Sequence, residues 1–570
     1  MAYIRLADNY RLRGFNDILY AIINKNNGSV EVLDKNIYYI LALCDGSIDM
    51  DMVFLTKTQR EILQNFMDKK LVVCSPHSDP ILPIQKYKKA DNNFLRSVHW
   101  SVTGNCNLRC RHCYMSAPDY KYKDLNTESC LEIIDQMEQA NVSSVSITGG
   151  EPFVRRDIWQ LLEYLCDKGI AVTEVYTNGL LLTDEVLGRI KKIVQPPRFV
   201  LSFDGVNGHD WLRGREGAEE ATVNAIRLLK QHGFEVMIET AVYEKNIETL
   251  LETYTLLKEL DIDFWKTSLI FQAGKWKEQL CRTIEVPELY QAYLHLIAKY
   301  MEDDAPFFLQ LDGFFACARN QEEQWFSPYK KKTVPFREGQ ELCCGTCRVH
   351  PYLLPDGTLL PCATMTDSPI ERHMPNLKDI SLSQIYRDPT HPFFKIANMR
   401  TGEILESNSD CAICAYNMEC QGGCRAMSLV EDRGLYGHSG VLCTFFKGGY
   451  EIKIDQTVKK ARKGGMKMNS REALENLMKK DPTVEQELRK IAELPETEAL
   501  DALHQFEQKH DIQLNPEDFE QQDEELKDQE LGKVAGGVDP LSVFTVITGV
   551  LGLFPTSTGR GTDKGTSRFK

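Results

Sequence analysis

The chain has 570 residues, of which 42% are apolar and 26% charged, and its formal net charge is −15 at pH 7. A chain of this length exceeds what one hydrophobic core usually covers, so we expect several domains with the composition of soluble globular proteins. The longest apolar run, residues 541–554, is interrupted by Thr and Gly and is too short to span a membrane. The negative charge disfavours nucleic acid as a partner.

The first ninety residues predict a small domain of strands and helices. Its predicted elements are strands at 20–23 and 30–33 joined by an Asn27-Gly28 turn, a helix at 36–46, and a helix with a short strand within 56–73. This region resembles the winged-helix leader-recognition element of peptide-modifying enzymes, which implies that residues 1–90 bind the leader of a precursor peptide. A winged helix can also bind DNA, but the charges here nearly balance and no basic recognition helix is present.

A short loop after the strand-like run at 97–103 carries three closely spaced cysteines, Cys106, Cys110 and Cys113. Three thiolates on one loop can hold three irons of a cubic 4Fe-4S cluster and leave the fourth iron open for a small ligand. The pattern resembles the cysteine loop of radical S-adenosylmethionine (SAM) enzymes. The resemblance implies that these cysteines bind a cluster that cleaves SAM to a 5′-deoxyadenosyl radical, which removes a hydrogen atom from substrate.

Apolar runs alternate with helical patterns beyond this loop, as expected of repeated βα units. We therefore predict an α/β fold in which residues 95–320 form a partial (β/α)6 radical SAM barrel. The predicted strands lie at 97–103, 144–148, 172–176, 198–204, 235–243 and 264–269.

Glycines and polar residues stand at the ends of these strands. Gly149 and Gly150 would let the backbone approach a ligand, and Glu151 offers a carboxylate to an ammonium group. The radical SAM resemblance implies that all three contact the methionine amino group of SAM and that Ser202 lies near its ribose or carboxylate. A Gly-Gly turn with a solvated Glu is the alternative. Weaker candidates, because any barrel needs polar residues at its turns, are Asn178, Asp204 and Glu239.

A second group of cysteines lies within residues 335–450 and resembles the SPASM extension of radical SAM peptide maturases, which houses two auxiliary 4Fe-4S clusters. The resemblance implies three clusters in all. It assigns the first auxiliary cluster to Cys347, Cys362 and Cys424, with Cys343 or Cys344 as the fourth ligand, and the second to Cys411, Cys414, Cys420 and Cys443.

Two other uses of these cysteines compete with clusters. Cys-x2-Cys pairs bind zinc, although a radical SAM barrel has no use for it. Disulfides are disfavoured because no signal peptide is present and because thiols at metal-ligand spacing indicate a reducing compartment. We therefore expect a cytoplasmic protein.

The segment at 469–535 is strongly acidic, with 19 Asp or Glu against 8 Lys or Arg. Helices are predicted from Asn469 or Ser470 and over 485–494 and 496–510. Together with the Gly536-Gly537 pair, the segment resembles leader peptides of the nitrogen-fixation-associated double-glycine family. That resemblance implies a linker at 451–467, a leader at 468–537 and a core peptide at 538–570. An acidic helical tail ending in a flexible linker is the alternative.

Taken together, the resemblances imply a radical SAM maturase attached to its own precursor, by natural gene fusion or by design. Its expected partners are the precursor peptide and an electron donor such as flavodoxin or ferredoxin, with neither nucleic acid nor a membrane. The expected product is an intrapeptide crosslink, either a thioether or a carbon-carbon bond. Since residues 444–570 contain no Cys, a thioether would need another precursor, whereas a carbon-carbon bond could use Phe544, Phe554 or Phe569.

Other outcomes remain open. The enzyme could instead epimerise its peptide, with Cys281 or Cys317 as a thiol hydrogen donor, excise part of the backbone, or desaturate a side chain. A different class of protein is also conceivable, in which a metal scaffold binds the leader without cleaving SAM and the tail is autoinhibitory.

Overall fold

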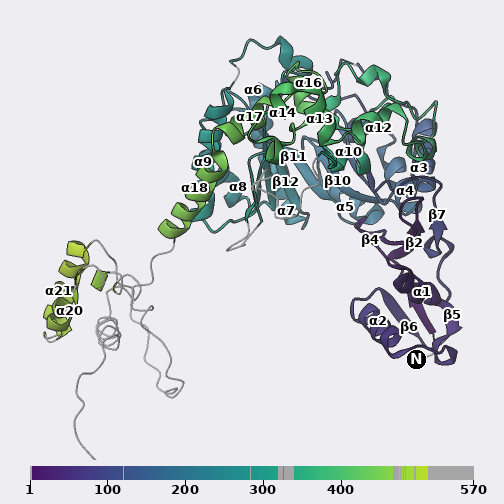
Figure 1. The fold of residues 1–570 in the computed structure, drawn as a ribbon, viewed down its shortest axis with the longest axis horizontal. Helices are drawn as coiled ribbons and strands as arrows, with labels where there is room; N and C mark the ends of the chain where they lie inside the picture. Colours follow the sequence, from purple (N-terminus) through teal and green to yellow (C-terminus); the bar gives the residue numbers. More distant parts are fainter. Residues whose placement is uncertain are drawn as a thin grey trace, which may run out of the picture. The chain divides into compact units, whose positions relative to one another are not determined.

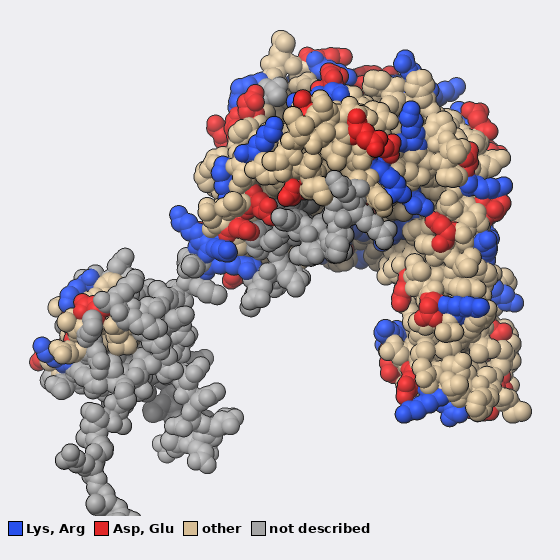
Figure 2. Space-filling view, in the orientation of Figure 1, with Lys and Arg blue, Asp and Glu red and all other residues tan. Residues whose placement is uncertain are grey.

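The computed structural model describes residues 3–465, apart from 120, 283, 319–324 and 327–338, together with most of 474–510. The chain divides into two compact units, Met1–Thr457 and Val458–Lys570. On the face of the first unit seen in Figure 2, basic and acidic side chains are interspersed rather than separated by sign. None of the helices in the described part of the chain is long and apolar enough to cross a membrane.

A sheet of eleven strands forms the centre of the first unit, in the order β16-β15-β14-β13-β12-β11-β10-β9-β8-β17-β18 (Figure 1). Seven consecutive strands pair in parallel: β8 Ser97–Ser101, β9 Ser144–Thr148, β10 Ala171–Thr177, β11 Arg198–Ser202, β12 Val236–Val242, β13 Phe264–Leu269 and β14 Phe308–Leu311. The six predicted strands are confirmed. The seventh, β14, adds a parallel strand that was not predicted, so the large parallel sheet of the expected α/β fold is wider than six strands.

Helices connect these parallel strands, as βα units require. Two of them begin at side-chain caps, since Asn126 accepts a hydrogen bond from Ser129 N and Thr183 accepts one from Val186 N. The helices are α3 Thr127–Gln139, α4 Ile158–Asp167, α5 Asp184–Ile193, α6 His209–Arg213, α7 Ala218–Gln231, α8 Leu250–Glu259 and α9 Val286–Glu302, with short 3-10 turns η3 Pro152–Val154 and η4 Gly274–Glu278.

The second cysteine region continues from the same sheet. Its hairpin of β17 Tyr352–Leu353 and β18 Leu359–Leu360 joins the sheet edge, because β17 pairs in parallel with β8. The strands β15 Phe315–Cys317 and β16 Trp325–Phe326 extend the opposite edge. Short helices make up the remainder: α10 Gly345–Val349, η5 Ala363–Met365, η6 Glu371–His373, α11 Leu382–Arg387, α12 Pro392–Ala397, α13 Thr401–Ser407, α14 Ser409–Ala412, α15 Asn417–Cys420, α16 Arg425–Val430 and α17 Gly440–Lys447.

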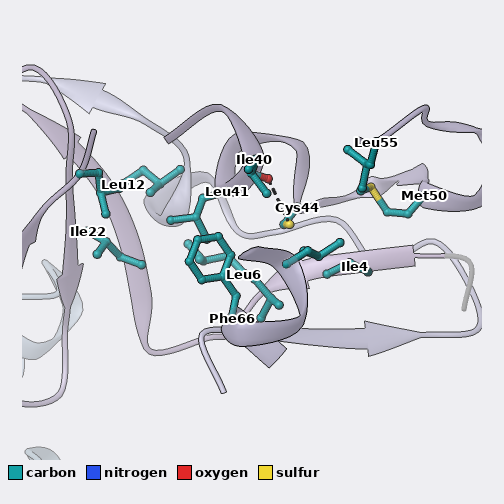
Figure 3. Packing of buried hydrophobic residues seen from close by; sticks show 13 residues of the cluster. Ile4, Leu6, Leu12, Ile22, Ile40, Leu41, Cys44, Met50, Leu55 and Phe66 are labelled. Carbon is teal, nitrogen blue, oxygen red and sulfur yellow. Dashed lines mark hydrogen bonds between the residues drawn. The ribbon is translucent and has the colours of Figure 1, made fainter. Parts of the chain in front are cut away.

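The first ninety residues form two small sheets, β5-β1-β6 and β4-β3-β2-β7, with two helices. Their buried core includes Leu6, Ile40 and Phe66 (Figure 3). The elements are β1 Tyr3–Leu6, β2 Tyr10–Gly14, β3 Ala21–Asn24, β4 Val30–Val32, α1 Lys35–Leu43, β5 Asp45–Asp49, η1 Met50–Met52, α2 Lys57–Asp68, β6 Val72–Ser75, η2 Pro83–Gln85 and β7 Lys88–Lys89.

The predicted hairpin within this region is confirmed, since β3 and β4 pair antiparallel around the Asn27-Gly28 turn. The first helix ends earlier than predicted. Its carboxyl end is capped by the N–H of Cys44, which donates to Leu41 O, and the residues that follow form β5 instead of a last helical turn.

Buried polar side chains fix this small domain against the amino ends of β9 and β10. Arg11 donates to the carbonyls of Val142 and Lys168 at 3.1 and 3.3 Å. Ser143 Oγ donates to Gly28 O at 3.0 Å. The carboxyl ends of these strands lie at the opposite ends of the same strands, so these contacts do not cover them.

Helices also occupy the region expected to be a linker and part of the acidic segment. Residues expected as a linker lie in helix α18, Tyr450–Gly465. The predicted second and third helices of the acidic segment are confirmed as α20 Thr483–Ala492 and α21 Glu496–His510. They share a small apolar core that includes Leu488 and Phe506. The Gly536-Gly537 pair and the core-like segment 538–570 lie outside the described residues.

Candidate functional site

The expected site residues follow the carboxyl ends of four adjacent parallel strands. The cysteine loop follows β8, Gly149–Glu151 follow β9, Asn178 follows β10, and Ser202 ends β11. Because the carboxyl ends of parallel strands meet at one edge of a sheet, these segments face a common space. The structure therefore brings together the residues that the sequence placed far apart.

The two glycines after β9 are required by the cysteine loop itself. A Cβ at Gly150 would lie 2.1 Å from Asn105 O, and one at Gly149 would lie 2.7 Å from Thr103 O. The backbones are joined there, since Gly150 N donates to Thr103 O at 2.7 Å and Glu151 N to Asn105 O at 2.8 Å. We expected these glycines to approach a ligand, and the structure shows that they also hold the loop that carries Cys106.

Glu151 is fully buried and its carboxylate is already occupied by donors. Thr177 Oγ1 donates to both carboxylate oxygens at 2.9 Å, and Asn178 N donates at 2.9 Å. Burial raises the pKa of Glu151 to about 7, although these donors lower it. The solvated Glu of the alternative interpretation is thus not what the structure contains.

The next two expected residues have different surroundings. Asn178 is buried, and its Nδ2 donates to Asn107 Oδ1 at 2.7 Å, which ties the β10 loop to the cysteine loop. Ser202 is partly exposed and lies in register with Glu239 of β12. Glu239 is not a turn residue, because it lies within the strand and accepts a hydrogen bond from Lys266 Nζ at 3.1 Å.

Two of the three thiols of the loop accept hydrogen bonds from backbone N–H groups. Leu108 N donates to Cys106 Sγ at 3.4 Å, and Ala117 N donates to Cys113 Sγ at 3.3 Å. Burial, together with negative charge at Cys110 and Cys113, raises the pKa of Cys106 to about 12. N–H donors aimed at sulfur are common around iron-sulfur clusters, so this donor set fits a cluster held by three thiolates.

The second cysteine region contains two groups of thiols. Cys347 hydrogen-bonds Cys344, and that bond and burial raise its pKa. Burial also raises the pKa of Cys362 and Cys424, and negative charge at Cys344 raises both further. The pKa of Cys343, in contrast, is raised to about 11 by burial, and the strongest charge acting on it is that of Arg425.

The other group contains the remaining four cysteines. Burial raises the pKa of Cys411, Cys420 and Cys443, and negative charge at Cys414 adds to each of these shifts.

Zinc would need four ligands about 2.0–2.3 Å from one point. Within the part of the chain that the structure describes, no three His, Cys, Asp or Glu side chains converge on one metal ion in that way.

Sequence reasoning missed two buried arginines beside these thiols. Arg213 pairs with Asp204, with its Nε 2.7 Å from Asp204 Oδ2. Arg425 donates to the carbonyls of Gly423 and Leu435 and is 3% exposed. A charged residue directly after a cysteine, as in Cys424-Arg425, is the signal that could have identified Arg425, whereas no cysteine lies near Arg213 in the sequence.

Comparison with known proteins agrees with this geometry. Residues 100–257 match the model of the Radical SAM superfamily. AdoMet-dependent heme synthase from Methanosarcina barkeri is 28% identical over 347 residues, which cover 59% of this chain and 93% of that protein. The subtilosin biosynthesis protein AlbA of Bacillus subtilis is 25% identical over 363 residues, 62% of this chain and 72% of AlbA.

A solved structure extends the comparison to most of the chain. The crystal structure of Streptococcus suis SuiB bound to the precursor peptide SuiA matches with a TM-score of 0.54 and 17% identity, covering 77% of this chain and 99% of SuiB. At this identity the match shows a shared fold alone. The superfamily match shows that the chain contains a radical SAM domain within residues 100–257, and with the similarity to a heme synthase and a biosynthesis protein it indicates a radical SAM enzyme.

Proposed function

We propose that this enzyme is a maturase that modifies a ribosomally made precursor peptide. The observation that carries the proposal is the packing of the cysteine loop against Gly149–Glu151 at the carboxyl edge of the parallel sheet. With a 4Fe-4S cluster and SAM bound there, the site would supply a 5′-deoxyadenosyl radical that removes hydrogen from an unactivated carbon of the peptide.

The chain's own residues hold and shield this chemistry. Cys106, Cys110 and Cys113 would hold three irons, with backbone N–H groups orienting the sulfurs of Cys106 and Cys113. Gly149–Glu151 and Ser202 would contact SAM at the same edge, and Asn178 keeps the loops together through Asn107. Burial of Glu151 and Asn178 excludes water from beneath the site.

The two thiol groups of the second region would hold auxiliary clusters. We assign Cys344, rather than Cys343, as the fourth ligand of the first auxiliary cluster. Cys344 raises the pKa of all three other proposed ligands, Cys347, Cys362 and Cys424. The second is assigned to Cys411, Cys414, Cys420 and Cys443. Iron analysis after reconstitution tests the assignment. Cys344→Ala should lose iron, whereas Cys343→Ala should keep it, and the reverse result would exchange the two roles.

A groove in the first ninety residues supports recognition of a leader. It has a volume of about 350 Å³ and an apolar floor that includes Ile37, Leu41 and Ile62, with Glu31 and Lys69 also in its lining. It lies beside β4, the edge strand of its sheet. An edge strand can accept another strand and an apolar groove can accept a helix face, so either mode of peptide recognition is possible here.

Substitution in the groove tests this role. Ile62→Glu places a charge on the apolar floor and should reduce modification of a peptide spanning residues 468–570 supplied separately, while SAM cleavage without peptide is unchanged. Leu251→Glu is the matched control, because Leu251 lies on α8 and is 43% exposed. Equal modification by both variants would show that the groove does not bind the leader.

The central experiment uses the whole protein reconstituted anaerobically with iron and sulfide. After incubation with SAM and a reductant, 5′-deoxyadenosine is measured and residues 466–570 are analysed by mass spectrometry. Deoxyadenosine with a loss of two hydrogens in the core segment is expected. Cys106→Ala should abolish both, and the matched control Cys166→Ala, an exposed cysteine of α4, should abolish neither. A cluster-replete protein that forms no deoxyadenosine contradicts the proposal.

For the product, we propose a carbon-carbon crosslink at Phe544, Phe554 or Phe569, with epimerisation as the alternative. Epimerisation needs a hydrogen donor that a substrate radical can reach. Cys317 is fully buried, whereas Cys281 is partly exposed. Cys281 also packs against Trp276, and Lys275 in the same segment donates its backbone N–H to Cys113 O. Uptake of deuterium from solvent that Cys281→Ala abolishes and Cys317→Ala preserves would establish epimerisation.

A tetrapyrrole is the second candidate substrate, favoured by the similarity to a heme synthase. That match covers 59% of this chain, and the peptide proposal offers a role for the groove and helical segment outside the shared domain. Incubation with an iron-coproporphyrin separates the candidates, since a porphyrin product with an unaltered core segment would favour the tetrapyrrole.

A further inference from the structure

A buried ion pair next to the cysteine loop has no part in the chemistry described so far. Arg213, at the end of α6, is 8% exposed. Its Nε and Nη2 donate to the two oxygens of Asp204 at 2.7 and 3.1 Å. The remaining nitrogen, Nη1, donates to Cys110 Sγ at 3.8 Å, a normal distance for a hydrogen bond to sulfur.

The backbone fixes this contact in place. Arg111, the residue after Cys110, donates its N–H to Leu212 O at 2.8 Å and its side-chain Nε to Trp211 O at 2.9 Å. A Cβ at Gly214 would lie 2.8 Å from Arg109 O, so helix α6 and the loop approach without intervening side chains. Arg213 and Cys110 are thus held opposite each other by contacts on both sides.

Asp204 determines how much charge Arg213 presents to the sulfur. It is fully buried, and it also accepts a hydrogen bond from Ala241 N at 3.1 Å. Burial raises the pKa of Asp204, but the Arg213 guanidinium, with smaller contributions from His209 and His112, more than offsets this and holds the pKa well below the usual range. The carboxylate is therefore ionised, and the pair presents Cys110 with an N–H donor from an ion pair with no net charge.

We propose that Arg213 is a positioning residue that raises the reduction potential of the cluster held by Cys106, Cys110 and Cys113, and that Asp204 limits this effect. The inference rests on the proposed cluster at these cysteines. Reduction adds one electron, and hence one negative charge, to the cluster and its thiolates. A hydrogen bond donated to a ligand sulfur therefore stabilises the reduced form more than the oxidised form.

Two substitutions should move the potential in opposite directions. Arg213→Met removes the donor and leaves the buried Asp204 carboxylate without its guanidinium partner, so the midpoint potential should become more negative. Asp204→Asn keeps the shape but leaves the guanidinium without its counter-charge, so the potential should become more positive. A loosened structure would not produce shifts of opposite sign.

The measurement is an anaerobic redox titration of the reconstituted full chain with dithionite as the one-electron donor, followed by electron paramagnetic resonance. The signal that changes on addition of SAM identifies the cluster with the open iron. Iron content confirms that each variant is loaded, and Arg109→Met, an exposed arginine of the same loop, is the matched control and should show no shift.

Three results would overturn the inference: a loaded Arg213→Met protein with an unchanged potential, shifts of the same sign in both variants, or a negative or zero shift in Asp204→Asn. The last applies even if Arg213→Met fails to bind iron. Failure of the proposed cluster is distinguishable, because the unaltered protein itself would then show no signal that responds to SAM. Failure of the peptide substrate is distinguishable too, because the signal and both shifts would then remain while the peptide stays unmodified.

Discussion

The two cysteine regions each contain a buried arginine, but the two arginines are held in different ways. Arg213 is neutralised by Asp204 and keeps one donor for Cys110. Arg425 donates four hydrogen bonds, all to backbone carbonyls, those of Gly422, Gly423, Leu435 and Gly437. Among the described residues, no carboxylate pairs with Arg425, and its charge acts on thiols of both auxiliary groups.

This difference indicates two separate tasks. At the proposed SAM site, the charge of Arg213 is balanced and directed at one sulfur, which would suit fine adjustment of a cluster that must be reduced. In the second cysteine region, Arg425 holds a loop together without a carboxylate partner among the described residues and would offset the negative charge of thiolates that bind the proposed auxiliary clusters. Burial of a charge is costly in either place, so each arrangement depends on its partners remaining present.

Removal of Arg425 should have the largest effect. Arg425→Met would leave four carbonyls unsatisfied and the thiolates without a cation, at a cost of about 3 kcal/mol or more. We expect iron content to fall by up to about two thirds, to that of one 4Fe-4S cluster. Arg433→Met is the matched control, because Arg433 is a half-exposed arginine of the same segment paired with Glu431. Full iron content in Arg425→Met would show that its charge is not needed.

The two cysteine regions also differ in the space around a glycine that lies beside the cysteines. Gly150→Ala places a Cβ 2.1 Å from Asn105 O, so the cysteine loop must move and SAM cleavage should be lost. Gly345→Ala, beside Cys344, meets nothing within 4 Å and should leave iron content and activity unchanged. Deoxyadenosine assays and iron analysis measure both. An active Gly150→Ala enzyme would contradict the close packing described here.

Only part of the fold and of the candidate site could be predicted from the sequence. Alternating apolar runs predicted six parallel strands correctly, because a strand buried on both faces leaves a clear pattern. The cysteine spacing also predicts which thiols would share a cluster, and this stays a prediction. The sequence could not show that Gly150 also holds the cysteine loop, because that contact joins residues 45 positions apart. It also could not choose between Cys343 and Cys344, which depends on how one short helix begins.

A smaller effect should follow from the buried carboxylate at the SAM site. The pKa of Glu151 is about 7 in the folded protein, above its ordinary value of 4.5. The folded state therefore holds its proton more tightly, and stability should fall as pH rises from about 4.5 to about 7, by about 3 kcal/mol in all.

Glu151→Gln imitates the protonated form, so it should lose this pH dependence. Thermal unfolding of the cluster-free protein and of Glu151→Gln at pH 5, 6, 7 and 8 measures the difference. The stability of Glu151→Gln relative to the parent should increase as pH rises to about 7 and should stay constant above that pH. A constant difference across this range would show that Glu151 ionises normally.

The smallest effect is expected at an exposed arginine of the same cysteine loop. Arg109 pairs with Asp119 at 3.0 Å, but the Arg109 side chain is 69% exposed and the Asp119 side chain 50%. Water and salt screen such a pair, so it contributes little to stability. Arg109→Met should leave the unfolding temperature and iron content unchanged. Arg109 is next to Cys110 in the sequence, and Arg213 contacts Cys110 in space. A large effect at Arg109 would therefore show that proximity to the proposed cluster, rather than burial and a fixed donor, decides what an arginine does there.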